Sequence, residues 1–447
     1  MQRIFRYILP LLLAWTVLFT NAQTIREQYK AKKKDTIYSI ARKFGVTIEE
    51  LTLTNPQMQA ADYQLKKGEV VNIPEPVANA SVGMDNTANL FRTPAATLRV
   101  GVILPLNDQN ADGRRMVEYY RGFLMACDSL RLEGYSIDIH AWNVGQADDV
   151  RTVLLEPSAA QCDLIVGPYY TNQIAPLADF CQRNRIRLAV PFASSFGEVE
   201  RFPQIFKMAQ TAALQNMMAV SAFLDRFPQH HPVFIDCHDA DSQKGTFTEA
   251  LRSKLDEKGV SYNLTSLQSS DDQFAKAFSK TAHNVVILNS ASQQQLQAVV
   301  QRMEKLTANV QGLYISLYGY AEWIGYEAAL KPAFHKYDTY IPTAYYFNAY
   351  GDRTKGFARS YEQWFKTDMQ RLLPRYALTG YDHAQYLLRG IRQFGHNFIG
   401  TRQQSTLSTP IQTPLRFKRA TATGGLMNET FMLIHYRQDK AVDMIHY

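Results

Sequence analysis

The stretch that decides the fold of most of the chain is QCDLIVGPYYTNQIAPLADFCQRNRIRLAVPFASSF, residues 161–196. An apolar run at 164–166 ends in a Gly-Pro pair, a polar–apolar helical run follows, and a second apolar run at 188–190 ends in Pro191. This pattern predicts strand, turn, helix, strand and turn, with both turns at the carboxyl ends of parallel strands. Because open α/β sheets bind ligands at such ends, the stretch predicts where a site lies.

The same unit recurs on both sides of this stretch. Residues 98–104, LRVGVIL, predict a buried strand, and 116–132 predict a long helix with one apolar face. A second α/β series begins at residue 211. We therefore expect two doubly wound lobes with these bounds: lobe 1 at about 98–210 and 345–400, lobe 2 at about 211–344, and a C-terminal β segment at 410–447.

The first residues have the pattern of an export signal. Arg3 and Arg6 precede an apolar run at 7–19, and small residues at 20–22 suit a cleavage site. Residues 1–22 are therefore predicted to be a cleaved signal peptide, which places the protein in the periplasm or cell envelope. A retained membrane anchor is the alternative.

Composition describes a folded protein with a mild basic bias. Of 447 residues 46% are hydrophobic and 20% charged, and the formal charge is +7. No nucleic-acid-binding motif accompanies this charge, so no nucleic acid is expected as a partner.

The four cysteines are not spaced as CxxC pairs, which argues against a zinc ribbon. Cys162 and Cys181 would meet at one edge of a βαβ unit, and a disulfide between them is one alternative. Free buried thiols are the other.

A small module precedes the α/β lobes. Ile37, Ile40, Ala41 and Phe44 share one helical face, and a second short helix ends at Asn55-Pro56. Short alternating strands flank the pair, which predicts a β-α-α-β unit. The proline- and alanine-containing stretch that follows, residues 77–97, is predicted to be a linker.

The module, assigned to residues 23–76, resembles the lysin motif (LysM) domain. The resemblance rests on the Asp-Thr-apolar helix start, on Asn55-Pro56 and on the closing LKKGEVVNIP, although Lys34 stands where the family usually has glycine. The family binds N-acetylglucosamine (GlcNAc)-containing polymers between two loops. Carried over, the glycan-binding residues are Asp35, Thr36, Ile37, Asn55, Pro56, Gln57 and Met58, with Ile37 and Met58 offering apolar surface to the sugar. Helix capping and helix termination are the structural alternatives for Asp35 and for Asn55-Pro56.

The larger part resembles the type I periplasmic binding proteins, which include branched-chain amino-acid receptors of ABC transporters. The resemblance rests on the order and spacing of LRVGVILPL, LIVGPYY, RLAVPFASS and ALTGYDHAQYLLRG within about 98–400. It implies a ligand between two lobes joined by three crossovers. Carried over by position, the cleft residues are Tyr169, Ala193, Ser194, Ser195, Asp239 and Tyr318. Such groups suit a small polar ligand, for example an amino acid.

Signatures of catalysis were not found. No two glycines are spaced as GxG, no His is followed by Glu, and there is no G-x-S-x-G elbow. The cluster of His238, Asp239 and Asp241 is a weak metal signal. We therefore expect no enzyme, no cofactor and no metal.

Two functions remain open from the sequence. In the first, the protein is anchored to peptidoglycan through LysM, and its bilobal domain is a recognition or scaffold module for an envelope protein partner. In the second, it is a solute-binding receptor of an ABC-type transporter or sensor. The wall anchor favours the first, because a shuttle must diffuse. The aromatic-rich run at 337–350 suits a partner surface, the cleft or the core.

Overall fold

The computed structural model describes residues 25–33, 35–44, 46, 48–59, 63, 65–74, 97–401, 404 and 407–447. These residues fall into two compact units, one before and one after the predicted linker. The predicted signal peptide, residues 77–96 of the linker, and Lys34 lie outside the described residues. None of the helices in the described part of the chain is both long enough and apolar enough to cross a membrane.

The first unit is the expected β-α-α-β module. Its strands β1 and β2 pair antiparallel. Apolar side chains from the helices and from β2, among them Ile40, Leu51 and Ile73, are buried between them. The elements are β1 (Ile25–Lys30), α1 (Ile37–Phe44), α2 (Ile48–Thr54), the 3-10 helix η1 (Pro56–Gln59) and β2 (Val70–Pro74).

Lobe 1 is built on a seven-stranded sheet in the order β13-β14-β7-β6-β5-β3-β4. All its pairings are parallel except β13 with β14. Its strands are β3 (Leu98–Leu104), β4 (Ile137–Asn143), β5 (Leu164–Val166), β6 (Arg187–Val190), β7 (Ile205–Lys207), β13 (Phe417–Arg419) and β14 (Leu426–Asn428).

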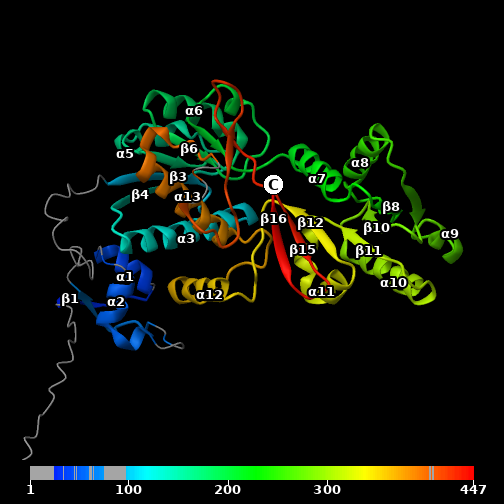
Figure 1. Ribbon diagram of the computed structural model, residues 1–447. Coiled ribbons are helices and arrows are strands. Elements are labelled where there is room, and N and C mark those ends of the chain that lie inside the picture. Colours follow the sequence, from blue (N-terminus) through cyan, green and yellow to red (C-terminus); the bar gives the residue numbers. More distant parts are fainter. Residues whose placement is uncertain are drawn as a thin grey trace, which may run out of the picture. The chain divides into compact units, whose positions relative to one another are not determined.

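Helices cover both faces of this sheet, as doubly wound folds require (Figure 1). Val100 and Val102 pack towards α3 and α13, whereas Ile103 and Ile165 pack towards α6. The helices are α3 (Ala111–Leu132), α4 (Arg151–Leu154), α5 (Pro157–Ala160), α6 (Ile174–Arg183), α12 (Asp352–Phe365) and α13 (Tyr376–Phe394), with the 3-10 helices η2 (Thr171–Gln173), η3 (Glu198–Glu200) and η5 (Gly395–Asn397).

Two glycines allow α3 and α13 to touch backbone to backbone. A Cβ on Gly122 would lie 1.8 Å from the Ala377 carbonyl oxygen, and one on Gly380 would lie 2.0 Å from the Tyr119 oxygen. Any side chain at either position would therefore force the helices apart.

Lobe 2 has a second seven-stranded sheet in the order β16-β15-β12-β11-β10-β8-β9. Its strands are β8 (His231–Asp236), β9 (Asn263–Ser266), β10 (Asn284–Leu288), β11 (Ile315–Tyr318), β12 (Thr339–Thr343), β15 (Met432–Tyr436) and β16 (Val442–His446). Its helices are α7 (Ala212–Arg226), α8 (Gly245–Glu257), α9 (Asp271–Lys276), α10 (Gln293–Asn309) and α11 (Glu327–Lys336), with the 3-10 helix η4 (Ala321–Tyr326).

The C-terminal β segment is divided between the lobes. The segment predicted at 410–447 does not form one sheet: β13 and β14 extend the lobe 1 sheet, while β15 and β16 pair antiparallel beside β12 in lobe 2 (Figure 1). The chain therefore passes between the lobes three times, after β7, after β12 and between β14 and β15.

Asp382 of α13 holds the returning segment against lobe 1. Its buried carboxylate accepts hydrogen bonds from the backbone amides of Ile411, Gln412 and Thr413, each at 2.8 Å. Burial raises the pKa of Asp382 to about 6, although these three bonds oppose the shift.

All four cysteines are buried free thiols, so the disulfide considered between Cys162 and Cys181 is not formed in this structure. Burial raises the pKa of Cys127, Cys162 and Cys237 to about 12. These thiols therefore act as small core residues rather than as nucleophiles.

Candidate functional site

Thr36, rather than Asp35, caps the first helix of the small unit. The Ser39 amide donates to Thr36 Oγ1 at 3.0 Å, and the Thr36 amide donates to Ser39 Oγ at 2.9 Å. Asp35 faces β1, where its carboxylate accepts from the Tyr29 hydroxyl at 2.8 Å and from the Lys32 amide at 2.7 Å. Desolvation opposes ionisation of Asp35, but these two bonds outweigh it and lower the pKa of the carboxyl.

Asn55 joins the two halves of this unit. Its side-chain amide donates to the carbonyls of Leu51 and Asn72, both at 2.7 Å, and its Oδ1 accepts from the Asn72 amide at 2.8 Å. The residue is fully buried and all these bonds are internal. Asn55 therefore shapes the second loop and leaves Pro56 and Gln57 to face solvent.

Ile37 and Met58 do not offer the apolar surface that we expected of them. Their side chains are only 2% and 3% exposed, because both pack into the core of the module. These two residues therefore offer a glycan almost no accessible surface. The glycan-binding role of the two loops stays a prediction.

In the larger unit, the strand order locates the ligand-binding edges. In lobe 1 the chain moves from β3 to β4 on one side and then to β5 on the other; lobe 2 repeats this with β8, β9 and β10. The carboxyl ends of β3 and β5, and those of β8 and β10, therefore flank the topological switch points at which open α/β sheets bind ligands.

At the lobe 1 switch point, Tyr169 follows β5 and meets the start of α3. Its hydroxyl donates to Asp112 Oδ1 at 2.9 Å, and Asp112 forms an ion pair with Arg115 at 3.3 Å. The Tyr169 ring lies against Tyr170 and Phe192. Tyr169 is half-buried, and burial raises its pKa to about 12.

The residues after β6 differ from one another in how far they are buried. The Ala193 side chain is buried, Ser194 is half-buried and Ser195 is exposed. Neither serine caps a helix, since the next helix, η3, begins at Glu198. Their role in a cleft stays a prediction.

At the lobe 2 switch point, Asp239 is held by the residues that follow β10. The Ser290 hydroxyl donates to Asp239 Oδ2 at 2.5 Å. Asn289 accepts from the Cys237 amide and donates to Asp236 Oδ1, both at 2.8 Å. Asn289 and Ser290 were not among the residues predicted from the sequence, which in lobe 2 were Asp239 and Tyr318.

Tyr318 does not face a cleft. It is the last residue of β11 and is fully buried, with its hydroxyl donating to the Ala219 carbonyl at 2.7 Å. Its ring packs against Phe223 and Phe247. The carried-over assignment failed because Tyr318 belongs to the strand itself rather than to the loop after it, and its side chain is buried in the core.

A cavity of about 280 Å³ lies at the carboxyl edge of the lobe 2 sheet; we call it the interlobe cavity. Its walls combine aromatic, amide and charged side chains, and none of the six predicted cleft residues is among them. The lining residues are Gln215, Asn216, Ala219, Lys244, Phe247, Tyr320, Ala321, Glu322, Pro342, Thr343, Ala344, Tyr345, Leu373 and Phe431. At the cavity wall Lys244 Nζ contacts Glu322 Oε1 at 2.7 Å. The same Nζ lies 4.9 Å from the centre of the Tyr320 ring.

Leu373 enters this cavity from lobe 1. It belongs to the loop between α12 and α13, residues 366–375, and packs against both the core of lobe 2 and the α12–α13 cluster. A Cβ on Gly325 of η4 would lie 3.2 Å from Leu373 Cδ1. The absence of a side chain at Gly325 thus lets Leu373 approach closely.

The base of this loop is fixed to lobe 1 by Glu118. The carboxylate is 2% exposed and accepts from the Gln370 amide at 2.8 Å and from the Ala377 amide, in the first turn of α13, at 3.4 Å. Burial raises the pKa of Glu118, although both bonds oppose the shift. The loop is therefore anchored at one end on lobe 1 and packed at its tip against lobe 2.

Comparison with known proteins identifies the two units separately. Residues 29–74 match the family model for the LysM domain. A search of the curated protein sequences found no match.

Among solved structures, a branched-chain amino acid ABC transporter protein from Rhodospirillum rubrum aligns with a TM-score of 0.53 and 15% identity, covering 78% of this chain and 100% of that chain. A periplasmic ligand-binding protein of this transporter class from Burkholderia xenovorans aligns with a TM-score of 0.46 and 12% identity, covering 78% of this chain and 94% of that chain. Full-length LpoA from Haemophilus influenzae aligns with a TM-score of 0.47 and 13% identity, covering 79% of this chain and 60% of that chain. At these identities the likeness concerns the fold. The chain thus carries a LysM domain at residues 29–74, followed by a distant type I periplasmic binding protein fold like that of branched-chain amino-acid receptors.

Proposed function

We propose that this chain is a cell-envelope protein that attaches to GlcNAc-containing wall glycan through its LysM domain and recognises a protein partner with its bilobal domain. The observation that carries the second half is Leu373, which packs against both lobes at the interlobe cavity. A domain that fills part of its own cavity has less need of a solute to hold its lobes together.

The glycan half rests on the LysM match and on the two loops around α1 and η1. Pro56 and Gln57 are exposed, while Asn55 and Thr36 hold the loop backbones in place from within. Such fixed backbone groups suit the acetamido groups of GlcNAc, because preorganised donors and acceptors lose little entropy on binding.

The test is co-sedimentation of the full chain with isolated sacculi. We expect wild type to pellet, and Gln57→Ala to pellet less because it removes an exposed contact in the predicted loop. Gln268→Ala, which truncates an exposed glutamine of the bilobal domain, should behave as wild type. If wild type stayed in the supernatant, the proposal of glycan binding would be contradicted. If both variants pelleted equally, the glycan contact would not include Gln57 of η1.

Solute reception is the second candidate, favoured by the size and mixed lining of the interlobe cavity. Aromatic walls with a few polar groups are typical of small-ligand sites. In that case a solute would contact Tyr345, Asn216 and the Lys244–Glu322 pair. Tyr345→Phe and Asn216→Ala should then abolish a solute-induced rise in melting temperature, whereas a wall-bound recognition protein shows no such rise.

A further inference from the structure

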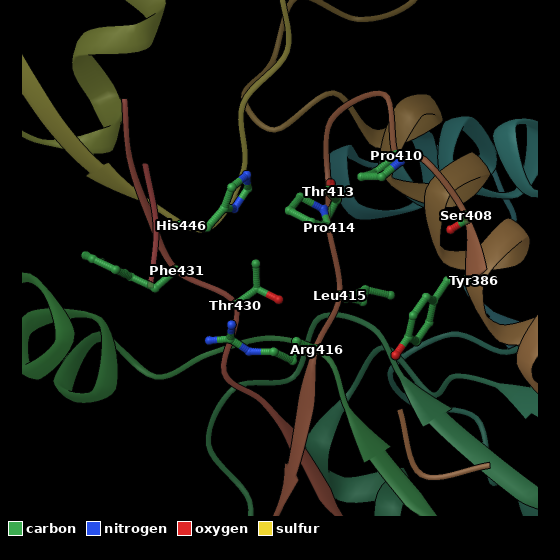
Figure 2. Close-up of a pocket in the computed structure, with 10 residues that line it drawn as sticks. All are labelled: Tyr386, Ser408, Pro410, Thr413, Pro414, Leu415, Arg416, Thr430, Phe431 and His446. Carbon is green, nitrogen blue, oxygen red and sulfur yellow. The ribbon is translucent and has the colours of Figure 1, made fainter. Parts of the chain in front are cut away.

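A second cavity of about 240 Å³ lies where chain segments pass between the lobes; we call it the hinge cavity. Figure 2 shows its walls, which come from both lobes. Lobe 1 contributes Tyr386 of α13 and the segment 408–416, lobe 2 contributes His446 of β16, and the crossover between β14 and β15 contributes Thr430 and Phe431.

Thr430 is an unsatisfied polar group in this wall. The residue is 5% exposed, and its hydroxyl has no hydrogen-bond partner among the described residues. Figure 2 shows the hydroxyl oxygen directed towards the middle of the ring of lining residues. A buried hydroxyl without a partner is costly, so a group that fills the cavity and bonds it would be favoured.

The charges beside Thr430 favour an anion. Arg416 Nε lies 3.1 Å from Glu429 Oε1, and Lys418 Nζ lies 4.0 Å from Glu429 Oε2, so two cations share one carboxylate. Arg416 also donates from Nη2 to the backbone oxygens of Tyr447 and Glu429. These bonds hold the guanidinium at the cavity wall, and the Arg416 side chain is 20% exposed.

The rest of the wall is mixed: Ser408, Thr413 and His446 are polar, and four lining residues are apolar. Pro410, Pro414, Leu415 and Phe431 line it, and the Tyr386 hydroxyl is already bonded to the Gly400 carbonyl at 3.1 Å. An occupant therefore needs one charged acceptor group at the Arg416 and Thr430 end and an apolar body against the prolines and Leu415.

We propose that the hinge cavity binds a small organic carboxylate with a short apolar body. The carboxylate accepts from the Thr430 hydroxyl and is attracted by Arg416, while the apolar body packs on Leu415 and the two prolines. Because its walls come from both lobes, an occupant contacts both, at a place distinct from the interlobe cavity and independent of glycan binding.

The experiment uses the full chain with hexanoate as the probe and hexanamide, which has the same shape without the charge, as the matched ligand. Binding is followed by titration calorimetry on wild type, Thr430→Val and Thr339→Val. Thr339 is the matched control because it is also a buried threonine whose hydroxyl has no partner among the described residues, but it lies on β12 and does not line this cavity.

We expect saturable hexanoate binding by wild type and Thr339→Val, about tenfold weaker binding by Thr430→Val, and weaker binding of hexanamide throughout. Both valine variants should fold, since each replaces an unpaired hydroxyl by a methyl group. Ser408→Phe, which fills the cavity from its wall, should abolish binding. Absence of saturable binding by wild type would overturn the proposal, leaving a cavity that holds only water, and so would equal affinities for Thr430→Val and wild type or for the two ligands.

Discussion

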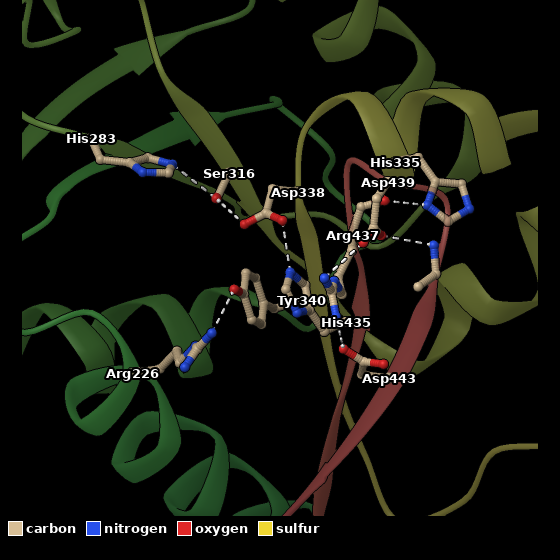
Figure 3. Close-up of polar contacts among 11 residues, drawn as sticks. Arg226, His283, Ser316, His335, Asp338, Tyr340, His435, Arg437, Asp439 and Asp443 are labelled. Atoms are coloured by element: carbon tan, nitrogen blue, oxygen red, sulfur yellow. Dashed lines mark hydrogen bonds and ion pairs between the residues drawn. The ribbon is translucent and has the colours of Figure 1, made fainter.

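The two ends of the lobe 2 sheet use polar side chains in opposite ways. At the amino end, His283 Nε2 lies 3.0 Å from Ser316 Oγ, Ser316 donates to Asp338 Oδ2 at 3.3 Å, and His435 Nε2 contacts Asp338 Oδ1 at 2.7 Å (Figure 3). Burial opposes ionisation of Asp338, yet the bonds from His435 and Ser316 outweigh it and lower its pKa. This chain of contacts ties neighbouring strands together.

At the carboxyl end, the polar side chains border a cavity instead. Lys244 and Glu322 pair with one another at its wall, with side chains 28% and 48% exposed. The difference follows from geometry, because strands are about 5 Å apart at their starts whereas the loops after them diverge. Polar residues within hydrogen-bond distance of one another stabilise the sheet, whereas those on diverging loops line a cavity.

The largest expected effect comes from breaking the amino-end network. Asp338→Ala should lower the free energy of unfolding by about 3 kcal/mol, because it leaves His435 and Ser316 without their partner in a largely buried place. Asp338 also has a positive φ of 39°, which aspartate and asparagine tolerate better than alanine. Asp338→Asn keeps that tolerance and an acceptor oxygen, so it should cost less; denaturant unfolding measures both.

The carboxyl-end pair is the matched control for this prediction. Lys244→Ala should cost less than about 1 kcal/mol, because partly exposed ion pairs contribute little. If Lys244→Ala lowered the free energy of unfolding as much as Asp338→Ala, the polar residues at the two ends of the lobe 2 sheet would not differ in their role.

A pH titration tests a buried histidine whose contact is a tyrosine hydroxyl rather than a carboxylate. His383 of α13 lies 3.1 Å from the Tyr119 hydroxyl, and burial lowers its pKa to about 3. Between its ordinary pKa of about 6.5 and that value the unfolded chain binds more protons, so stability falls as the pH falls.

His383→Gln should remove the part of this pH dependence that comes from the histidine. Its loss of stability between pH 7 and pH 5 should be about 2 kcal/mol smaller than that of wild type. Chemical denaturation at the two pH values measures the difference. Equal losses in both proteins would show that His383 is protonated in the folded state.

Leu373 offers a smaller test at the carboxyl end. Leu373→Ala should lower the free energy of unfolding by about 1.5 kcal/mol, because a half-buried leucine loses its contacts with both lobes. Leu155→Ala, at a leucine that is 84% exposed, should change it by less than about 0.5 kcal/mol. Equal effects would mean that the loop tip contributes nothing to the contact between lobes.

Periodicity predicted the elements whose partners are close in the chain. Local sequence pattern predicts the helical face of Ile37 and Ile40 and the apolar runs that form β3 and β5. β12 did not, because its residues lie within the aromatic-rich run, where Tyr337, Tyr340 and Phe347 are buried and Tyr350 is exposed. Aromatic composition alone does not separate core from surface.

The site was less predictable than the fold. Lys244 and Glu322 follow parallel strands, so the same rule that selected Asp239 could have selected them. Leu373 carried no such signal, because only the folded chain brings a loop between two lobe 1 helices to the lobe 2 cavity. The side chains of Ile37 and Met58 were assigned to a surface, although their apolar character equally suits the core in which they lie.

The most direct test of the proposed partner-recognition role is native mass spectrometry of the full chain, purified without refolding. A domain whose interlobe cavity is filled in part by Leu373 should take up no solute there, so any mass gained on soaking with amino acids and muropeptides should be the same in wild type and in Asn216→Ala. A discrete added mass that disappears in Asn216→Ala would contradict the account, and would make the bilobal domain a solute receptor.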